Sequence, residues 1–293
     1  MARWIEETFH SDWRPSIRAD KILHEVKTEH QHLVIFENNF WGKVLILDGV
    51  FQLTTRDEFI YHEMMAHVPL MALERPRKVL IVGGGDGGIL REVLKHPSVQ
   101  LATLVEIDQE VIDTSIKFYP EIGKAAFNNK RSNVVIADGL KFVAETKEKF
   151  DAIIVDSSEP MGPSAVLHSK PFFVDCKKAL KSGGIFVTQN SLPFHTPEHL
   201  TDTSRSLASL YRHVAPYVCT QPCYFGGEFC ISWASDDARH LQVAATTLKR
   251  RATRRGIKSR YWTPEFHVGA FALPGYIQKI VDKAVKKSIK PRK

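Results

Sequence analysis

The chain has 293 residues, of which 43% are apolar, and carries a formal net charge of +7 with four cysteines. This apolar share can fill a large core, but no apolar run approaches the ~20 residues that a membrane span needs, so we expect no membrane partner. Four cysteines without a CxxC pair exclude a disulfide framework and predict reduced thiols, and an N-terminus without the pattern of a signal peptide predicts a cytoplasmic protein.

The positive charge is concentrated near the C-terminus. Residues 249–293 hold 14 Lys and Arg against 2 acids, so residues 1–248 hold 26 against 31. No nucleic-acid-binding motif accompanies the stretch LKRRATRRGIKSR. We therefore expect a solvated helix face followed by a frayed basic tail, KAVKKSIKPRK, and no nucleic-acid partner.

The first 56 residues contain short β-type runs separated by polar or glycine-containing breaks: HLVIFEN, GKVLILDG and VFQLTT. They predict a small N-terminal antiparallel β domain over residues 1–56. The next segment, DEFIYHEMMAHVPLMAL, has apolar residues at helical spacing and ends before ERPRK. It predicts a linking helix within residues 57–77.

From residue 78 onward, β-branched strands alternate with amphipathic helices. The predicted strands are KVLIVGG, ATLVEID, NVVIAD, FDAIIVDS and IFVTQN, and the last predicted helix runs through HLTDTSRSLASLYRHV. This alternation is typical of a doubly wound, mostly parallel, Rossmann-like sheet, here over residues 78–293. The later segments YVCTQPCYF and CISWAS predict an antiparallel pair at one edge.

Ligands of such sheets bind beyond the carboxyl ends of the strands, so the residues at those ends matter. The first strand leads into the glycine loop GGGDGG, and the second ends at Glu106, 18 residues after Gly88, where an acid can hold both ribose hydroxyls. After the third strand, Asp138 can accept from an adenine amino group while Gly139 leaves room for the ring. The alternative for Asp138 is a helix N-cap without a binding role.

Asp86 in the middle of the glycine loop indicates which nucleoside is bound. It would repel a pyrophosphate, and no P-loop lysine follows it, so dinucleotides and ATP are disfavoured. An adenosyl sulfonium fits better. Decarboxylated S-adenosylmethionine presents an aminopropyl ammonium without a carboxylate, and an acid at this position favours that cation.

The fourth strand ends in the stretch DSSEP, with Asp156 and Glu159 three residues apart. Acids beside a nucleoside pocket suggest a cationic co-substrate. An amine with a pKa near ~10.4 is almost fully protonated at neutral pH, so a carboxylate is needed to accept its proton. We interpret Asp156 as that base and Glu159 as the anchor of the distant ammonium of a diamine; alternatively, both acids only cap the turn.

Six motifs in order give the chain a resemblance to polyamine aminopropyltransferases of the spermidine synthase type over about residues 3–276: LDGVFQLTTRDEFIYHEM, VLIVGGGDGGILREVLKHPSV, VEID, ADG, DSSEPMGP and FALPGY. The resemblance implies aminopropyl transfer from decarboxylated S-adenosylmethionine to putrescine, giving spermidine and methylthioadenosine. It implies no metal or redox cofactor, since the adenosyl compound is a co-substrate. It also implies a homodimer or a homotetramer.

The resemblance also assigns site residues in this chain. Donor binding falls on Gln31, Asp86, Glu106, Asp138, Gly139 and Pro163. Acceptor binding falls on Tyr61, His62, Asp86, Asp156, Ser157, Ser158, Glu159 and Tyr224, with Asp156 as the proton acceptor. His195 and His199 have metal-ligand spacing, but without further ligands nearby we expect no metal site.

The departures from the family lie on the acceptor side. The family usually has Asp where Glu159 stands, often a Tyr near Phe173, and an acid-containing stretch in place of SAVLH. Glu is one methylene longer than Asp. Either the backbone turn accommodates this extra length and putrescine is still used, or the acceptor site is shortened and the preference shifts to a shorter diamine such as 1,3-diaminopropane. Two other classes stay open: a small-molecule S-adenosylmethionine-dependent methyltransferase, and a non-catalytic polyamine- or nucleoside-binding protein with a degenerate site.

Overall fold

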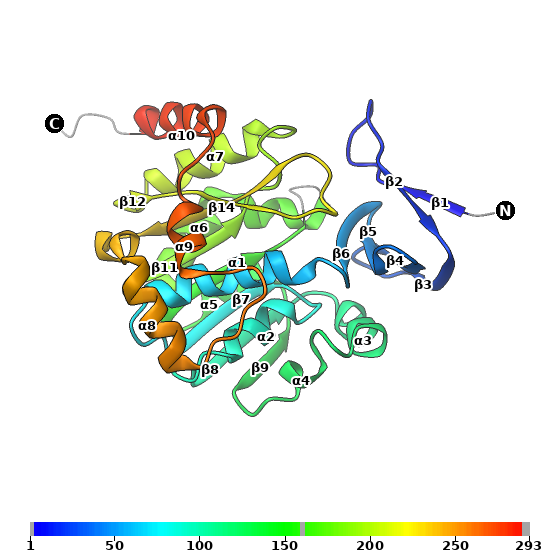
Figure 1. The fold of residues 1–293 in the computed structure, drawn as a ribbon, viewed down its shortest axis with the longest axis horizontal. Helices are drawn as coiled ribbons and strands as arrows, with labels where there is room; N and C mark the ends of the chain where they lie inside the picture. The colour runs from blue at the N-terminus through cyan, green and yellow to red at the C-terminus, as the bar shows by residue number, and fades with distance from the viewer. Residues whose placement is uncertain (1–2, 159–161, 289–293) are drawn as a thin grey trace.

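The computed structural model describes residues 3–158 and 162–288, without the side chains at 162–163 and 287–288. The N-terminal part is β-rich and lies at one end of the molecule, beside a larger α/β domain (Figure 1). It contains two antiparallel sheets, one of two strands and one in which four strands follow each other in chain order. The strands are β1 (Arg3–Glu6), β2 (Ser16–Ala19), β3 (Lys21–Lys27), β4 (His32–Asn38), β5 (Gly42–Leu47) and β6 (Val50–Thr54). The predicted antiparallel sheet structure is confirmed, and the three predicted runs form β4, β5 and β6.

Helix α1 (Glu58–Ala72) leads from this part into the larger domain. All but one of its residues are buried, including two glutamates and two histidines. Burial of ionisable groups is costly unless they are paired, so these four side chains must find partners inside the protein. Their partners, described below, lie mainly on the next helix and in the segment 260–262.

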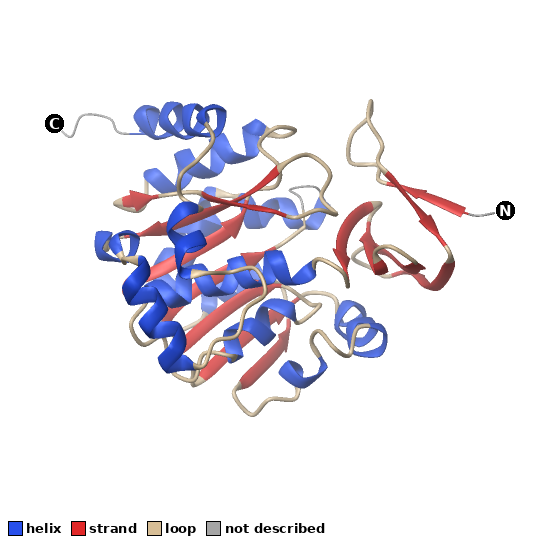
Figure 2. Ribbon diagram, viewed as in Figure 1, coloured by secondary structure: helices blue, strands red, loops and turns tan. Residues whose placement is uncertain are grey.

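The larger domain is built on a mixed sheet with helices on both faces (Figure 2). Its main path runs β12-β14-β11-β10-β7-β8-β9, and β13 pairs with β14. The five strands from β11 to β9 are parallel, and β12, β13 and β14 are antiparallel to their neighbours. The bounds are β7 (Lys78–Gly83), β8 (Leu101–Glu106), β9 (Ser132–Ile136), β10 (Phe150–Asp156), β11 (Leu180–Gln189), β12 (His213–Val214), β13 (Tyr217–Thr220) and β14 (Glu228–Ser235). This confirms the predicted Rossmann-like sheet and the antiparallel pairing of the two late segments.

Alternation along the strands divides the core between the two faces of the sheet. In β7, Val79 and Ile81 pack in the cluster that contains α1 and α2, whereas Leu80 and Val82 pack with residues of α5 and α6. Both sets are fully buried, as expected for a parallel sheet covered on both sides. The helices are α2 (Gly88–Leu94), α3 (Gln109–Phe118), α4 (Lys124–Phe127), α5 (Gly139–Glu145), α6 (Lys170–Ala179), α7 (Pro197–Ala208), α8 (Ala245–Arg255), α9 (Pro264–Gly269) and α10 (Gly275–Ser288), with the 3₁₀ helices η1 (Gly162–His168) and η2 (Ala238–Gln242).

The last predicted helix was too long. Helix α7 ends at Ala208, and residues 213–214 instead form β12, which pairs with β14. The N–H of Arg212 donates to the side chain of Asp236, which fixes the chain beside β14. A helical period in the sequence could not reveal this pairing, because the partner strand lies about 20 residues further along the chain.

The expected solvated helix face is present on α8, where Lys249, Arg250 and Arg254 are exposed, but Arg255 departs from it. Arg255 is buried, and its guanidinium donates to the carbonyls of Leu70, Leu73 and Glu74 at the end of α1. Leu70 lies in the last turn of α1, where carbonyls lack partners within the helix and carry the negative end of its dipole, so an arginine there is favourable. Part of the expected frayed tail is also helical, since α10 extends to Ser288 and packs on α7.

The four cysteines are buried and unbonded, which confirms the predicted free thiols. Within the described residues, none of the helices has both the length and the apolar character that crossing a bilayer requires.

Candidate active site

A cavity of about 170 Å³ lies between the carboxyl ends of the parallel strands and the N-terminal β part. Its walls include Leu45, Leu47, Phe51 and Gln52 from β5 and β6 together with the residues that follow β7, β8, β9 and β10. Strands β7 and β10 are neighbours although β8 and β9 come between them in sequence, so the strand order reverses here. This is the position where doubly wound sheets bind ligands.

The glycine loop brings its backbone against the end of β10. Gly83 has a positive φ of 80°, and a Cβ at this residue would lie 2.0 Å from the carbonyl oxygen of Asp156. The N–H of Gly84 donates to that same carbonyl at 3.1 Å. Only glycine permits both the backbone conformation and the close contact, which places the loop at the floor of the cavity.

Asp156 ends β10, and its carboxylate lines the cavity. The phenol of Tyr61 on α1 donates to its Oδ1 at 2.6 Å. Burial and the nearby charge of Asp156 raise the pKa of Tyr61 well above its usual value, so the phenol keeps its proton. Tyr61 therefore orients a carboxylate that faces the ligand space, as a general base requires.

Asp86 and His62 form an ion pair beside the glycine loop. His62 Nε2 lies 3.3 Å from Asp86 Oδ1, which also accepts the N–H of Gly88 at 2.6 Å. Burial alone would lower the pKa of His62, but the charges and hydrogen bonds of Asp86 and Glu58 raise it to about 10. Both members of the pair line the cavity.

Glu106 lies at the end of β8 and is buried. Its Oε1 accepts the N–H groups of Ile107 at 2.8 Å and Asp108 at 3.0 Å. Burial raises its pKa to about 7, because the two backbone hydrogen bonds only partly offset desolvation. A Cβ on Gly85 would lie 2.9 Å from Oε2, so the glycine loop approaches this carboxylate closely.

Gln31, from the N-terminal part, reaches across to the same region. Its amide Nε2 donates at 2.9 Å to Asp108 Oδ2, which also accepts from the hydroxyl of Thr28 at 2.8 Å. Asp108 is the N-cap of α3 and accepts the N–H of Glu110 with its other oxygen. The predicted donor residues Gln31 and Glu106 are thus brought to one cavity by two different parts of the fold.

Asp138 caps a helix and also lines the cavity, so its predicted contact with adenine stays a prediction. It is the N-cap of α5, with Oδ1 accepting the N–H of Leu140 at 2.8 Å, and it also lines the cavity. A Cβ on the adjacent Gly139 would lie 2.5 Å from Val82, so the helix starts tightly against β7. Capping does not exclude a ligand contact, because only one carboxylate oxygen is used.

The predicted acceptor turn is described only in part. Ser157 and Ser158 line the cavity, and their carbonyls accept from Gln189 Nε2 at 3.0 and 3.3 Å. Tyr224 also lines it, and its phenol donates to the carbonyl of Gln52 at 2.7 Å. Glu159 and the side chain of Pro163 lie outside the described residues, so their predicted roles stay predictions.

Several lining residues were not singled out from the sequence. They are Asp48, Gln52, Ile107 and Gln189. Gln189 could have been found, because it ends β11 and the rule about strand ends applies to it as well. Gln52 could not, since nothing in the sequence shows that β6 faces the end of β10.

The geometry combines a cavity, four carboxylates at or shortly after the carboxyl ends of the parallel strands, and aromatic walls. The carboxylates belong to Asp86, Glu106, Asp138 and Asp156, and the aromatic residues include Phe51, Tyr61, Tyr224 and Phe229. Such a site favours a ligand that carries positive charge on an apolar or nucleoside frame. A carboxylate with a fixed hydrogen-bond partner can also accept a proton there.

Comparisons with known proteins show which family the chain belongs to. Residues 58–244 match the spermine/spermidine synthase domain, and residues 3–55 match the spermidine synthase tetramerisation domain. The polyamine aminopropyltransferase of Pseudomonas syringae pv. tomato is 46% identical over 279 residues, covering 95% of this chain and 98% of the relative. That of Ruegeria sp. is 46% identical over 277 residues, covering 94% and 98%.

Solved structures show the same relationship. A spermidine synthase in complex with the transition-state analogue AdoDATO is 32% identical, with a TM-score of 0.91 and coverage of 96% of this chain and 95% of the other. Spermidine synthase from Thermotoga maritima is 32% identical, with a TM-score of 0.89 and coverage of 96% and 94%. The chain belongs to the spermidine synthase family of polyamine aminopropyltransferases.

Proposed function

We propose that this aminopropyltransferase uses decarboxylated S-adenosylmethionine and putrescine and releases spermidine and methylthioadenosine. The proposal rests mainly on the position of Asp156. Its carboxylate lines the cavity where the strand order reverses and accepts a hydrogen bond from Tyr61 at 2.6 Å. Glu106, Asp138, Gly139 and Gln31 then take the adenosyl part, and Asp86 takes the aminopropyl ammonium.

The proposed reaction is a direct displacement at carbon. Asp156 accepts a proton from the ammonium of putrescine, and the nitrogen lone pair attacks the aminopropyl carbon bound to sulfur. The C–N bond forms as the C–S bond breaks, and the sulfur keeps the electron pair as a neutral thioether. The new secondary amine carries the positive charge that the sulfonium lost, so charge and atoms balance without a metal or a redox cofactor.

The cellular setting and assembly are part of the same proposal. We propose a cytoplasmic enzyme, which the four buried, unbonded cysteines support because disulfides are rare in reducing compartments. We also propose a homodimer or homotetramer, supported by the match of residues 3–55 to the tetramerisation domain.

Diamine length tests the acceptor assignment. With saturating decarboxylated S-adenosylmethionine and varied diamine, we expect kcat/KM for putrescine to exceed that for 1,3-diaminopropane and for cadaverine by about tenfold, since one methylene in a fitted site is worth roughly that much. Products are identified by mass. Faster use of 1,3-diaminopropane by the wild type, with putrescine preference restored in Glu159→Asp, would instead show that Glu159 shortens the acceptor site.

A further inference from the structure

His62 lies between two carboxylates on the inner side of α1. Its Nδ1 is 2.6 Å from Glu58 Oε2, one helical turn earlier, and its Nε2 is 3.3 Å from Asp86 Oδ1. The His62 side chain is only 4% exposed. A carboxylate can only accept hydrogen bonds, so a ring with a carboxylate at each nitrogen is best satisfied as an imidazolium that donates on both sides.

Glu58 is itself fixed by a second cation. Arg91 on α2 donates from NH1 and NH2 to the two oxygens of Glu58 at 3.2 and 2.8 Å. Burial would raise the pKa of Glu58, but His62 and Arg91 together lower it to about 2. Glu58 is therefore a permanent anion at neutral pH, and its orientation is set by a two-point contact.

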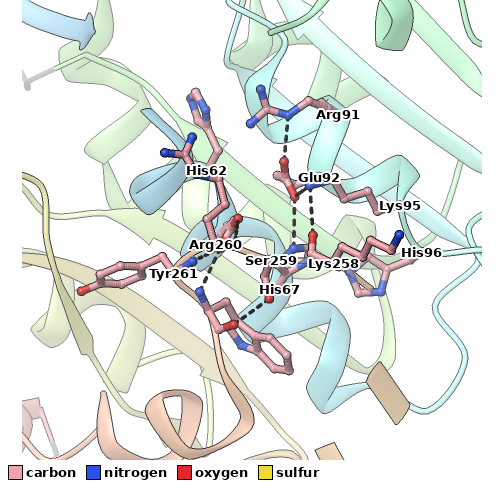
Figure 3. A network of polar contacts seen from close by, with 12 residues as sticks. His62, His67, Arg91, Glu92, Lys95, His96, Lys258, Ser259, Arg260 and Tyr261 are labelled. Atoms are coloured by element: carbon pink, nitrogen blue, oxygen red, sulfur yellow. Dashed lines mark hydrogen bonds and ion pairs between the residues drawn. The ribbon is translucent and has the colours of Figure 1, made fainter. Parts of the chain in front are cut away.

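Arg91 is locked in turn between α1 and α2. Its Nε donates to Glu92 Oε1 at 2.8 Å, and Glu92 Oε2 lies 3.1 Å from Nε2 of His67, which is on α1 (Figure 3). Arg91 is thus held by carboxylates from both helices, Glu58 on α1 and Glu92 on α2. The chain of contacts runs from this pair of helices to the carboxylate of Asp86.

The contacts from Arg91 through Glu58 and His62 end at the carboxylate of Asp86. Asp86 Oδ1 receives both His62 and the N–H of Gly88, while no contact of Oδ2 occurs among the described hydrogen bonds and ion pairs. The His62 ring also packs on Gly88, where a Cβ would lie 2.1 Å from the ring. If His62 lost a proton, one ring nitrogen would present a lone pair to a carboxylate, and the double donation that links Glu58 to Asp86 would be lost.

We propose that Glu58 and Arg91 are positioning residues for the amine-binding carboxylate of Asp86, acting through His62, which they hold as an imidazolium. The inference rests on the proposed function, in which Asp86 binds the aminopropyl ammonium of the donor. Neither residue lines the cavity, so neither is a catalytic residue. The groups that face His62 are Glu58 on its own helix, Asp86 from the loop before α2 and the Tyr61 ring, with Arg91 behind Glu58.

The test is the affinity of Glu58→Gln for two ligands at about pH 6 and about pH 8.5, measured by calorimetry. Decarboxylated S-adenosylmethionine carries the ammonium, and methylthioadenosine has the same adenosyl part without it. In the variant His62 keeps Asp86 but loses Glu58, one of its two anionic partners, so its pKa falls from about 10 toward the measured range. We expect the donor to bind about tenfold more weakly than to the wild type at the higher pH, the worth of a charge-assisted contact, and within about twofold at the lower pH.

Methylthioadenosine should bind equally well to the wild type and Glu58→Gln at each pH. The ratio of the two affinities also cancels the titration of Glu106, because both ligands meet that residue. The matched control is Glu63→Gln, a buried glutamate on the same helix that accepts the N–H groups of Arg260, Tyr261 and Trp262 and does not contact His62. It should show no new pH dependence of the ratio.

An equal loss of affinity for both ligands at every pH, or unchanged donor affinity, would overturn the positioning role alone. A wild type that neither binds the donor nor forms methylthioadenosine would overturn the proposed function as well. If Glu58→Gln does not fold, ¹⁵N-histidine NMR of the wild type decides, with the His62 signal assigned from its loss in His62→Gln. An imidazolium that persists beyond about pH 8.5 supports the proposal, and titration near the usual ~6.5 contradicts it.

Discussion

Replacing Asp156 with Asn is expected to lower kcat by about a thousandfold at neutral pH, the usual range for loss of a general base. An amine with a pKa of ~10.4 is neutral in only about one molecule in a few thousand at pH 7, and an amide cannot accept its proton. The hydrogen bond from Tyr61 can persist, because the amide oxygen still accepts. Steady-state rates of methylthioadenosine release at saturating donor and putrescine measure the effect.

The pH profile separates loss of the base from general damage to the site. The rate of Asp156→Asn should rise steadily toward about pH 10, as the neutral fraction of putrescine grows. Asp151→Asn is the matched control, since Asp151 lies on the same strand and accepts backbone N–H groups of Arg77 and Lys78 away from the cavity. It should keep most of the activity. A variant at Asp156 that kept more than about a tenth of the wild-type rate would refute its role as base.

The second large effect is expected at Glu106, through donor binding. Its pKa of about 7 in the free protein lies above the usual value because the carboxyl group is buried. Only the ionised form can accept from both ribose hydroxyls, so methylthioadenosine affinity should fall as the pH drops below about 7. At pH 8, Glu106→Gln should weaken binding by about 10- to 100-fold, as expected for losing charge-assisted hydrogen bonds.

The same substitution should also remove the pH dependence, because no titrating carboxyl group is left at the ribose position. Calorimetric titration of methylthioadenosine between about pH 5.5 and pH 8 compares the two proteins over the range in which Glu106 ionises. Glu110→Gln, on the nearby helix α3 and paired with His24, is the control and should bind like the wild type. If Glu106→Gln bound methylthioadenosine as tightly as the wild type does, Glu106 would not be part of the donor site.

Much of the fold follows from local patterns in the sequence. The β-branched runs and the glycine loop identified the parallel strands, and the rule about strand ends then pointed to Asp86, Glu106, Asp138 and Asp156. These predictions depend on apolar residues that recur every two residues in strands and every 3.6 residues in helices, and on the order of the strands along the chain. The structure brings all four carboxylates to one cavity.

Features that depend on distant partners could not be predicted. Arg255 reads as part of a solvated basic helix, but it is buried because α8 covers the end of α1. The short strand β12 exists only because β14 offers an edge to pair with. His62 was identified from a motif, whereas the contact of Glu58 with Arg91 joins residues 33 positions apart and required the packing of two helices.

The most direct test of the account is to supply putrescine with either S-adenosylmethionine or its decarboxylated form and to identify both products by mass. We expect equal amounts of methylthioadenosine and spermidine from the decarboxylated donor over many turnovers, and no methylated amine from either donor. Methylputrescine together with adenosylhomocysteine would show a methyltransferase instead. If the protein bound the decarboxylated donor without any turnover, it would be a non-catalytic binding protein. This result would contradict the assignment of Asp156 as a catalytic base.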